Sequence, residues 1–319
     1  MSTLILRGHD IRKLLDMSAV IKVVDQAFKD YAKGTAQMPA KAYLVVERGD
    51  FRAMPAAIPD AAGMKWVSVH PQNPILGLPT VMAMLIYNDP ATGYPLAVMD
   101  ATDMTDYRTG ATAALASKYL ARKNPRTLGI IGAGRQGSTQ LLAHLTLFKF
   151  EQIRIFDRDK EAAEKMISRY PQYPLRAFSL AEAAASDIVC TVTPVREPLV
   201  KKEWIKPGTH INAIGADAKG KEELEPSILK EATVVVDDLK QASSGGEINV
   251  PISKGLFRAE DVYATLGEII LGTKAGRKSD EQITVFDSTG VAIADVATAK
   301  LVYEKAKEAG TYTAVDILE

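Results

Sequence analysis

Three glycines with the spacing G-x-G-x-x-G directly follow the apolar stretch 127–131 and open a segment with helical periodicity. In a strand-turn-helix unit, such glycines allow a tight turn, close approach of the backbone to a pyrophosphate, and close packing of the helix on the strand. The N-terminus of the helix offers N–H groups to the anion. The pattern predicts a dinucleotide site at Gly132, Gly134 and Gly137, with Arg135 and Gln136 between them.

A second apolar stretch, 153–156, ends in Asp157. An acid at this distance from the glycine motif accepts hydrogen bonds from the adenosine ribose hydroxyls, which favours NAD over NADP. Arg158 follows immediately and could instead bind the 2′-phosphate of NADP or pack on adenine. The plainer alternatives are a structural turn for the glycines and an exposed loop acid for Asp157.

Two ionisable residues lie in settings that favour proton transfer. Lys65 lies between Met64 and Trp66 in an apolar stretch expected as a buried strand, and burial weakens the preference of a lysine for its charged form. Such a lysine can act as an acid/base; the alternative is an ion-paired or snorkelling side chain. Asp217 follows the apolar stretch 211–215, at the sheet edge where doubly wound folds bind ligands. The alternative for Asp217 is a helix cap.

Composition restricts the class of protein and of partner. The 319 residues contain 39 Lys+Arg and 39 Asp+Glu, and this balance argues against nucleic acid or an anionic membrane surface as partners. No apolar run approaches the roughly 20 residues that span a bilayer, so no membrane segment is expected. The single cysteine, Cys190, favours a reducing cytoplasm. His9, His144 and His210 lack paired spacing, so no metal site is expected.

The element pattern changes along the chain. Residues 18–31 have helical spacing with Ser18 as the expected N-cap. Short β-rich runs then alternate with Pro, Gly and Asn, which predicts an antiparallel meander before a helix at 103–122. The expected strands of the meander are 42–47, 64–70, 81–87 and 96–99.

Beyond residue 126, strands alternate with helices, which predicts an α/β fold: a Rossmann-type doubly wound parallel sheet beside a second α+β domain. The last helix, 292–307, is expected to return to the first domain. This gives a discontinuous domain 1–115 plus 295–319 and a second domain 116–294. The expected strands of the parallel sheet are 127–131, 153–156, 188–193, 209–215, 234–237 and 283–286.

Several motifs in one order resemble the ornithine cyclodeaminase/μ-crystallin family over nearly the whole chain, and within it most resemble the archaeal-type alanine dehydrogenases. The resemblance implies a substrate-binding and dimerisation domain, a Rossmann domain that binds NAD, and hydride transfer at a small amino acid or 2-oxo acid in the cleft between the domains. Ammonia as co-substrate and a homodimer are implied with it. The family resemblance rests on Met82–Arg122, the Gly132 loop and His210–Asp217. The motifs most like the archaeal-type alanine dehydrogenases are Arg52–Pro55, Gly63–Trp66, Gly77–Val81, Arg108–Gly110, Leu120–Asn124 and Phe286–Gly290.

The same resemblance assigns roles to individual residues. It places Lys41, Arg52, Lys65 and Arg108 around the substrate, with Lys65 and Asp217 as acid/base residues. The further residues that it implies for cofactor contact are Thr80, Arg108, Thr112, Thr193, Ala213, Ile214, Gly215, Lys221, Ser288 and Thr289.

Arg52 distinguishes between the activities of the family. Ornithine cyclodeaminases resemble this chain in the segment around Arg52. At the position that matches Arg52, however, they carry a glutamate that holds the distal amino group of ornithine. An arginine would repel that ammonium and would favour a carboxylate. We therefore expect an NAD-dependent alanine dehydrogenase that interconverts L-alanine with pyruvate and ammonia. The alternatives are an ornithine cyclodeaminase and a μ-crystallin-like ketimine reductase or ligand-binding protein.

Overall fold

The computed structural model describes residues 2–318, and the chain divides into two compact units. Unit 1 comprises the chain up to Arg108 together with Val291 onward, and unit 2 comprises Thr109–Gly290. The sequence placed these boundaries at 115/116 and 294/295. Within the described residues, none of the helices is both long and apolar enough to cross a membrane.

Unit 1 is built on a seven-stranded sheet in the order β15-β1-β6-β5-β4-β3-β2. The strands from β2 to β6 form the expected antiparallel meander, and β1 joins it in parallel with β6. The strands are β1 (Thr3–Leu6), β2 (Ala42–Val46), β3 (Gly49–Ile58), β4 (Ala61–Val69), β5 (Val81–Asn88), β6 (Pro95–Asp100) and β15 (Thr313–Val315). A 3₁₀ helix, η1 (Asn73–Leu76), lies between β4 and β5.

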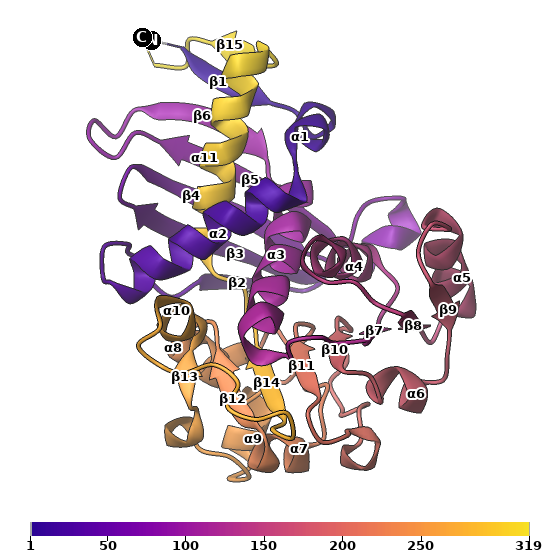
Figure 1. The fold of residues 1–319 in the computed structure, drawn as a ribbon. Helices are drawn as coiled ribbons and strands as arrows, with labels where there is room; N and C mark the ends of the chain where they lie inside the picture. Colours follow the sequence, from indigo (N-terminus) through magenta and orange to yellow (C-terminus); the bar gives the residue numbers. More distant parts are fainter. Residues whose placement is uncertain (1, 319) are drawn as a thin grey trace. The chain divides into compact units, whose positions relative to one another are not determined.

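The two faces of the unit 1 sheet have different environments. Cross-strand partners share a face, and the face that carries Met54, Lys65 and Leu85 is buried. Helix α11 (Ala292–Ala309) packs on β3 and β4 and against α2 (Met17–Ala32), as Figure 1 shows. A shorter helix, α1 (Gly8–Leu14), precedes α2. The opposite face of the sheet, which we call the open face, carries exposed apolar side chains.

Helix α3 (Thr102–Leu120) passes from unit 1 into unit 2 without a break. Arg108 is therefore inside a helix, as the helix expected at 103–122 implies. The helix expected at 18–31 begins differently, because Asp16 and not Ser18 is its N-cap: the Asp16 side chain accepts a hydrogen bond from Ala19 N.

Unit 2 contains an eight-stranded, wholly parallel sheet in the order β13-β12-β14-β11-β10-β7-β8-β9. The chain moves outward from β7 in one direction and then returns to add β10 on the other side, so β7 and β10 form the topological switch point of a Rossmann-type sheet. The expected fold class is confirmed. The strands are β7 (Thr127–Ile131), β8 (Gln152–Phe156), β9 (Leu175–Ala177), β10 (Ile188–Thr191), β11 (His210–Ala213), β12 (Thr233–Val236), β13 (Ala264–Thr265) and β14 (Thr284–Asp287).

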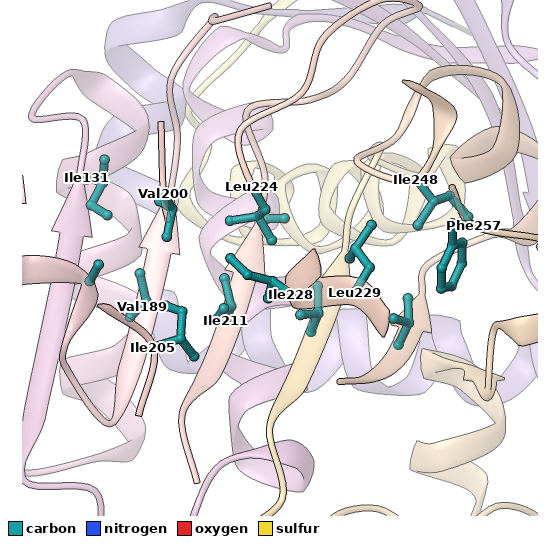
Figure 2. Close-up of a cluster of buried hydrophobic side chains, with 14 of the residues drawn as sticks. Ile131, Val189, Val200, Ile205, Ile211, Leu224, Ile228, Leu229, Ile248 and Phe257 are labelled. Carbon is teal, nitrogen blue, oxygen red and sulfur yellow. The ribbon is translucent and has the colours of Figure 1, made fainter. Parts of the chain in front are cut away.

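Both faces of the unit 2 sheet are buried, which explains its nearly continuous apolar strands. Figure 2 shows one face, where Ile131, Val189 and Ile211 of three neighbouring strands pack with Leu224 and Ile228. The helices of this unit are α4 (Arg135–Leu147), α5 (Lys160–Arg169), α6 (Leu180–Ala184), α7 (Pro226–Glu231), α8 (Leu239–Gly245), α9 (Asn249–Ser253) and α10 (Leu266–Leu271). The 3₁₀ helices are η2 (Lys202–Trp204) and η3 (Ala259–Asp261).

A polar network lies inside the other face of this sheet. His144 Nε2 is 2.9 Å from Ser117 Oγ, and Asn212 links that hydroxyl to His210, whose Nδ1 is 2.9 Å from Thr284 Oγ1. Both histidines are fully buried. Burial is the main cause that lowers the pKa of His144 to about 4 and that of His210 to about 3. Both rings are therefore neutral near pH 7 and serve as structural hydrogen-bonding groups.

We predict that the free energy of unfolding falls as the pH drops below about 6.5. Both imidazoles bind protons in the unfolded chain at such pH values, whereas their lowered pKa values keep them unprotonated in the folded protein. Each histidine contributes up to about 1.4 kcal/mol per pH unit. Urea unfolding at pH 7.5, 6 and 5 measures the slope. His144→Gln should reduce this slope. An equal slope in the wild type and in His144→Gln would contradict the prediction.

Candidate functional site

Lys65 lies at the centre of a buried ionic cluster in unit 1. It points from β4 to the helix-covered face between its cross-strand neighbours Met54 and Leu85, and it is 1% exposed. Its Nζ donates to Asp295 Oδ1 of α11 at 2.8 Å and to Thr105 Oγ1 of α3 at 3.3 Å. Two helices and one strand, distant in sequence, thus meet at a single ammonium group.

Arg108 completes the cluster from one turn further along α3. Its Nε donates to the same oxygen, Asp295 Oδ1, at 2.9 Å. Both Arg108 and Asp295 are buried, so one carboxylate oxygen is shared by two cations away from water. This excess of positive charge suits the site to an anion.

The electrostatic setting of Lys65 lowers its pKa toward neutrality. Burial, followed by the Arg108 guanidinium, lowers its pKa from 10.5 to about 7, and Lys41 acts in the same direction. The Asp295 carboxylate opposes them by charge and hydrogen bond. A lysine with such a pKa exchanges its proton readily near neutral pH, as a general acid or base must.

Arg52 points to the same face from the neighbouring strand. It pairs with Val67, two residues from Lys65, so Arg52 and Lys65 are diagonal neighbours on the sheet. The buried Arg52 side chain is oriented by Asp50, whose Oδ1 accepts from Nε at 2.6 Å, and by the Tyr43 ring, 5.3 Å from its Cζ. The four basic residues that the sequence selected are therefore brought to one region of unit 1.

Asp295 was missed by sequence reasoning. An acid embedded in the apolar run 291–297 of a long helix is the signal that could have revealed it, because a carboxylate is rarely buried without a cation as partner. Thr80, predicted for cofactor contact, lies just before β5, where its carbonyl accepts from His70 N at 2.8 Å.

The glycine motif of unit 2 has the geometry of an anion-binding turn. Gly132 has φ +111°, and a Cβ on Gly137 would lie 2.1 Å from Gly132 O, so neither position accepts a side chain without strain. Gly134 is the N-cap of α4, is exposed, and has open space where a Cβ would stand. Arg135 and Gln136 form the first turn of α4. The turn thus leaves room for a phosphate beside the N-terminal N–H groups.

Asp157 is bound to this turn. One of its oxygens accepts from Ala133 N at 2.7 Å and the other accepts from Asp159 N at 2.9 Å. Arg158 beside it is exposed. The carboxylate therefore joins the end of β8 to the glycine turn, which is the position that a ribose-binding acid occupies in such sheets.

Buried carboxylates also fix the other loops at the carboxyl edge of this sheet. Glu223 accepts from Thr193 N at 2.7 Å, Thr193 Oγ1 at 2.6 Å and Gly215 N at 2.8 Å. Glu247 accepts from the backbone of Glu223 and Leu224. Burial and then the Glu223 charge raise the pKa of Glu247 well above its usual value.

Of the other residues predicted for cofactor contact, Ala213 and Ile214 lie at the end of β11 and Thr112 is buried in α3.

Asp217 lies in the loop that follows β11, and its Oδ1 accepts from Lys221 Nζ at 2.5 Å. No helix begins there, since α7 starts at Pro226. The helix-cap interpretation of Asp217 is therefore not supported. Gly220 N donates to Asn249 Oδ1 at 2.9 Å, which anchors the turn between Asp217 and Lys221.

Ser288 and Thr289 follow β14 and are held by Asp237 at the end of β12. The Asp237 carboxylate accepts from Ser288 Oγ at 3.2 Å, Thr289 Oγ1 at 3.1 Å and Gly290 N at 2.7 Å. Sequence reasoning missed Asp237 and Glu223, because their partners are backbone and hydroxyl groups that leave no pattern in the sequence.

These observations define a class of protein: a two-unit chain with a Rossmann-type dinucleotide turn in one unit and, in the other, a buried cationic cluster that contains a lysine with a lowered pKa. The model of the ornithine cyclodeaminase/mu-crystallin family matches residues 1–310. The chain belongs to this family, as the motifs predicted.

Individual relatives agree with that assignment. The alanine dehydrogenase of Archaeoglobus fulgidus is 53% identical over 308 residues, covering 96% of each chain. The archaeal alanine dehydrogenase dimer solved with bound NAD is 51% identical, with a TM-score of 0.98 and full coverage of both chains. The Δ1-pyrroline-2-carboxylate reductase of Thermococcus litoralis, solved with NADH and L-proline, is 39% identical, with a TM-score of 0.94 over 98% of this chain and 100% of the other.

Proposed function

We propose that this protein is an NAD-dependent alanine dehydrogenase that converts L-alanine, NAD⁺ and water reversibly to pyruvate, ammonium, NADH and a proton. The observation that carries the proposal is the buried Lys65, with a pKa near 7, in a cationic cluster with Arg108 and beside Arg52. The 53% identity to the alanine dehydrogenase of Archaeoglobus fulgidus supports the substrate. The single cysteine, Cys190, is buried and unpaired, which suits the cytoplasmic location that we propose with it.

The dinucleotide turn fits NAD by its own geometry. The open space at Gly134 and the α4 N-terminus would hold the pyrophosphate, and Asp157 would hold the ribose. Thr193, Gly215, Lys221, Ser288 and Thr289 are the proposed contacts to the rest of the cofactor. When bound, the nicotinamide accepts or donates the hydride that leaves or reaches the substrate α-carbon.

The basic residues of unit 1 would bind the substrate carboxylate. Arginine has five N–H donors in a fixed fork that matches a carboxylate, and Asp50 and Asp295 orient the two guanidinium groups. An ammonium on a longer side chain would meet Arg52 instead of an acid. This repulsion favours a short substrate such as alanine over ornithine.

Two groups would move the protons of the reaction. In the oxidative direction the amine must become an imine, add water and lose ammonia. Lys65 would give a proton to or take one from the oxygen of the carbinolamine and carbonyl, because its pKa lies near working pH. Asp217 would hold and deprotonate the attacking water or the amine, and Lys221, bonded to its Oδ1, keeps it oriented.

The direct test is an absorbance assay at 340 nm with NADH, ammonium and a panel of 2-oxo acids. We expect NADH oxidation with pyruvate and much slower oxidation with larger 2-oxo acids. Ornithine plus NAD⁺ and Δ1-pyrroline-2-carboxylate plus NADH are run in parallel. If the enzyme does not turn over pyruvate but does turn over ornithine or Δ1-pyrroline-2-carboxylate, the alanine dehydrogenase assignment is rejected. The family assignment would still stand.

We predict that Lys65→Ala and Asp217→Asn each lower kcat by about 10² to 10⁴-fold, the range of a lost general acid or base. NADH binding, measured by fluorescence, should remain within about threefold, since neither residue belongs to the dinucleotide turn. The wild-type rate should change through pH 7, and this change should disappear from the residual rate of Lys65→Ala. Retained activity in one variant would remove the proposed role from that residue alone.

Gly134→Ala should weaken NADH binding by about tenfold or more, because its methyl group would occupy the space beside the α4 N-terminus. Its melting temperature should stay close to that of the wild type, since no atom lies within 4 Å of the added Cβ. Gly137→Ala is the contrasting variant, because the close contact with Gly132 O should lower the melting temperature. Unchanged NADH affinity in Gly134→Ala would place the pyrophosphate elsewhere.

We also propose a homodimer that buries the open face of the unit 1 sheet. Leu44, Trp66, Met84 and Ile86 lie on this face across neighbouring strands and are 55%, 40%, 57% and 40% exposed. Contiguous apolar surface of this kind marks an interface. The related archaeal structure is a dimer.

The double variant Met84→Glu, Ile86→Glu should be monomeric by light scattering coupled to gel filtration, because four carboxylates would be buried in each dimer. Leu239→Glu, at a 40% exposed leucine of α8 in unit 2, is the control and should stay dimeric. A dimeric double variant would exclude the open face as the interface.

A further inference from the structure

The ion pair of Lys65 with Asp295 has an uncommon feature: one oxygen serves two cations. Asp295 Oδ1 is 2.8 Å from Lys65 Nζ and 2.9 Å from Arg108 Nε. When Lys65 loses its proton, the carboxylate keeps Arg108 as its partner. With the lysine neutral, Asp295 and Arg108 form a neutral pair; with the lysine protonated, the cluster has one positive charge in excess, which a substrate carboxylate would balance.

The same geometry fixes the direction of the lysine ammonium. An ammonium has three N–H donors in tetrahedral arrangement. One is directed to Asp295 of α11 and a second to Thr105 of α3, whose own hydroxyl donates to Ala101 O at 2.7 Å. With two donors committed, the direction of the third is determined.

Asp295 itself has a fixed position. It lies in the first turn of α11, after the N-cap Val291, and it is 2% exposed. Helix α11 packs against β3, β4 and α2, so the carboxylate cannot shift without moving a buried helix.

We propose that Asp295 is a positioning residue for Lys65: it orients the ammonium so that its third N–H points at the substrate oxygen that receives the proton. The same carboxylate holds the Arg108 guanidinium next to this N–H. This inference rests on the proposed function, in which Lys65 is the acid/base. Asp295 transfers no proton itself.

The charged groups around Lys65 give the proposal a measurable signature. Burial, Arg108 and Lys41 lower the pKa of Lys65, and Asp295 alone among the named charges raises it. Arg52, on the adjacent strand, is paired with Asp50. Replacing the Asp295 carboxylate with an amide should therefore lower the pKa of Lys65 further.

In the full-length enzyme, we expect Asp295→Asn to move the Lys65-dependent limb of the pH–rate profile to lower pH by about one unit or more. Its kcat should fall more than its KM for pyruvate rises. Thr298→Val is the matched control: Thr298 is buried one turn further along α11, and its hydroxyl donates to Ala294 O. Its profile should coincide with that of the wild type.

Asp295→Glu separates charge from position. Because this variant keeps the carboxylate, the Lys65-dependent limb of the pH–rate profile should stay near its wild-type pH. The added methylene displaces the carboxylate oxygen that binds Lys65 and Arg108, so kcat should fall by about 10²-fold. If Asp295→Asn does not fold, this variant carries the test. A wild-type kcat in Asp295→Glu would overturn the proposal.

A second readout does not depend on turnover. Because its pKa is lowered in the folded protein, Lys65 makes the free energy of unfolding rise with pH between about 7 and 10.5. In Asp295→Asn this rise should begin at a lower pH. An unchanged onset and an unchanged rate limb would overturn the role of Asp295, and so would an equal shift in Thr298→Val. Failure of the wild type to turn over pyruvate would reject the proposed function instead.

Discussion

The sharing of the Asp295 carboxylate by Lys65 and Arg108 is the interaction on which the unit 1 site depends. It permits a lysine to be buried in the middle of a sheet while its proton remains exchangeable near neutral pH. Without the acid, two cations would face each other in a medium of low polarity, and the strand and both helices could not pack as closely. Close packing of the strand and both helices, and exchange of the Lys65 proton, therefore require the same arrangement of Lys65, Arg108 and Asp295.

Unit 2 uses carboxylates for a different purpose. Asp157, Glu223, Glu247 and Asp237 each accept hydrogen bonds from backbone N–H groups of loops at the carboxyl edge of the parallel sheet. Loops at this edge have no strand neighbours to satisfy their donors. The half-buried Asp157 and the buried Glu223, Glu247 and Asp237 satisfy these donors. A loop held in this way presents its remaining groups in a fixed arrangement.

The sequence predicted what depends on local order and missed what depends on packing. The glycine turn, Asp157 and the buried strand around Lys65 follow from neighbouring residues. Asp295 lies 230 residues from Lys65, so only the folded chain brings them together. Strand β3 was missed because Pro55 interrupts its pattern, and β9 and β13 are too short to give a periodic signal.

The two places where the chain passes between the units differ in stiffness. Helix α3 carries the chain from Arg108 to Thr109 through unbroken helical hydrogen bonds, whereas the second passage runs through Gly290, with φ +81°, next to Val291. A helix resists bending, and a glycine absorbs changes of backbone angle. The second passage therefore absorbs changes of backbone angle that the helical passage resists, while Arg108 and Asp295, which both belong to unit 1, keep their hydrogen bond.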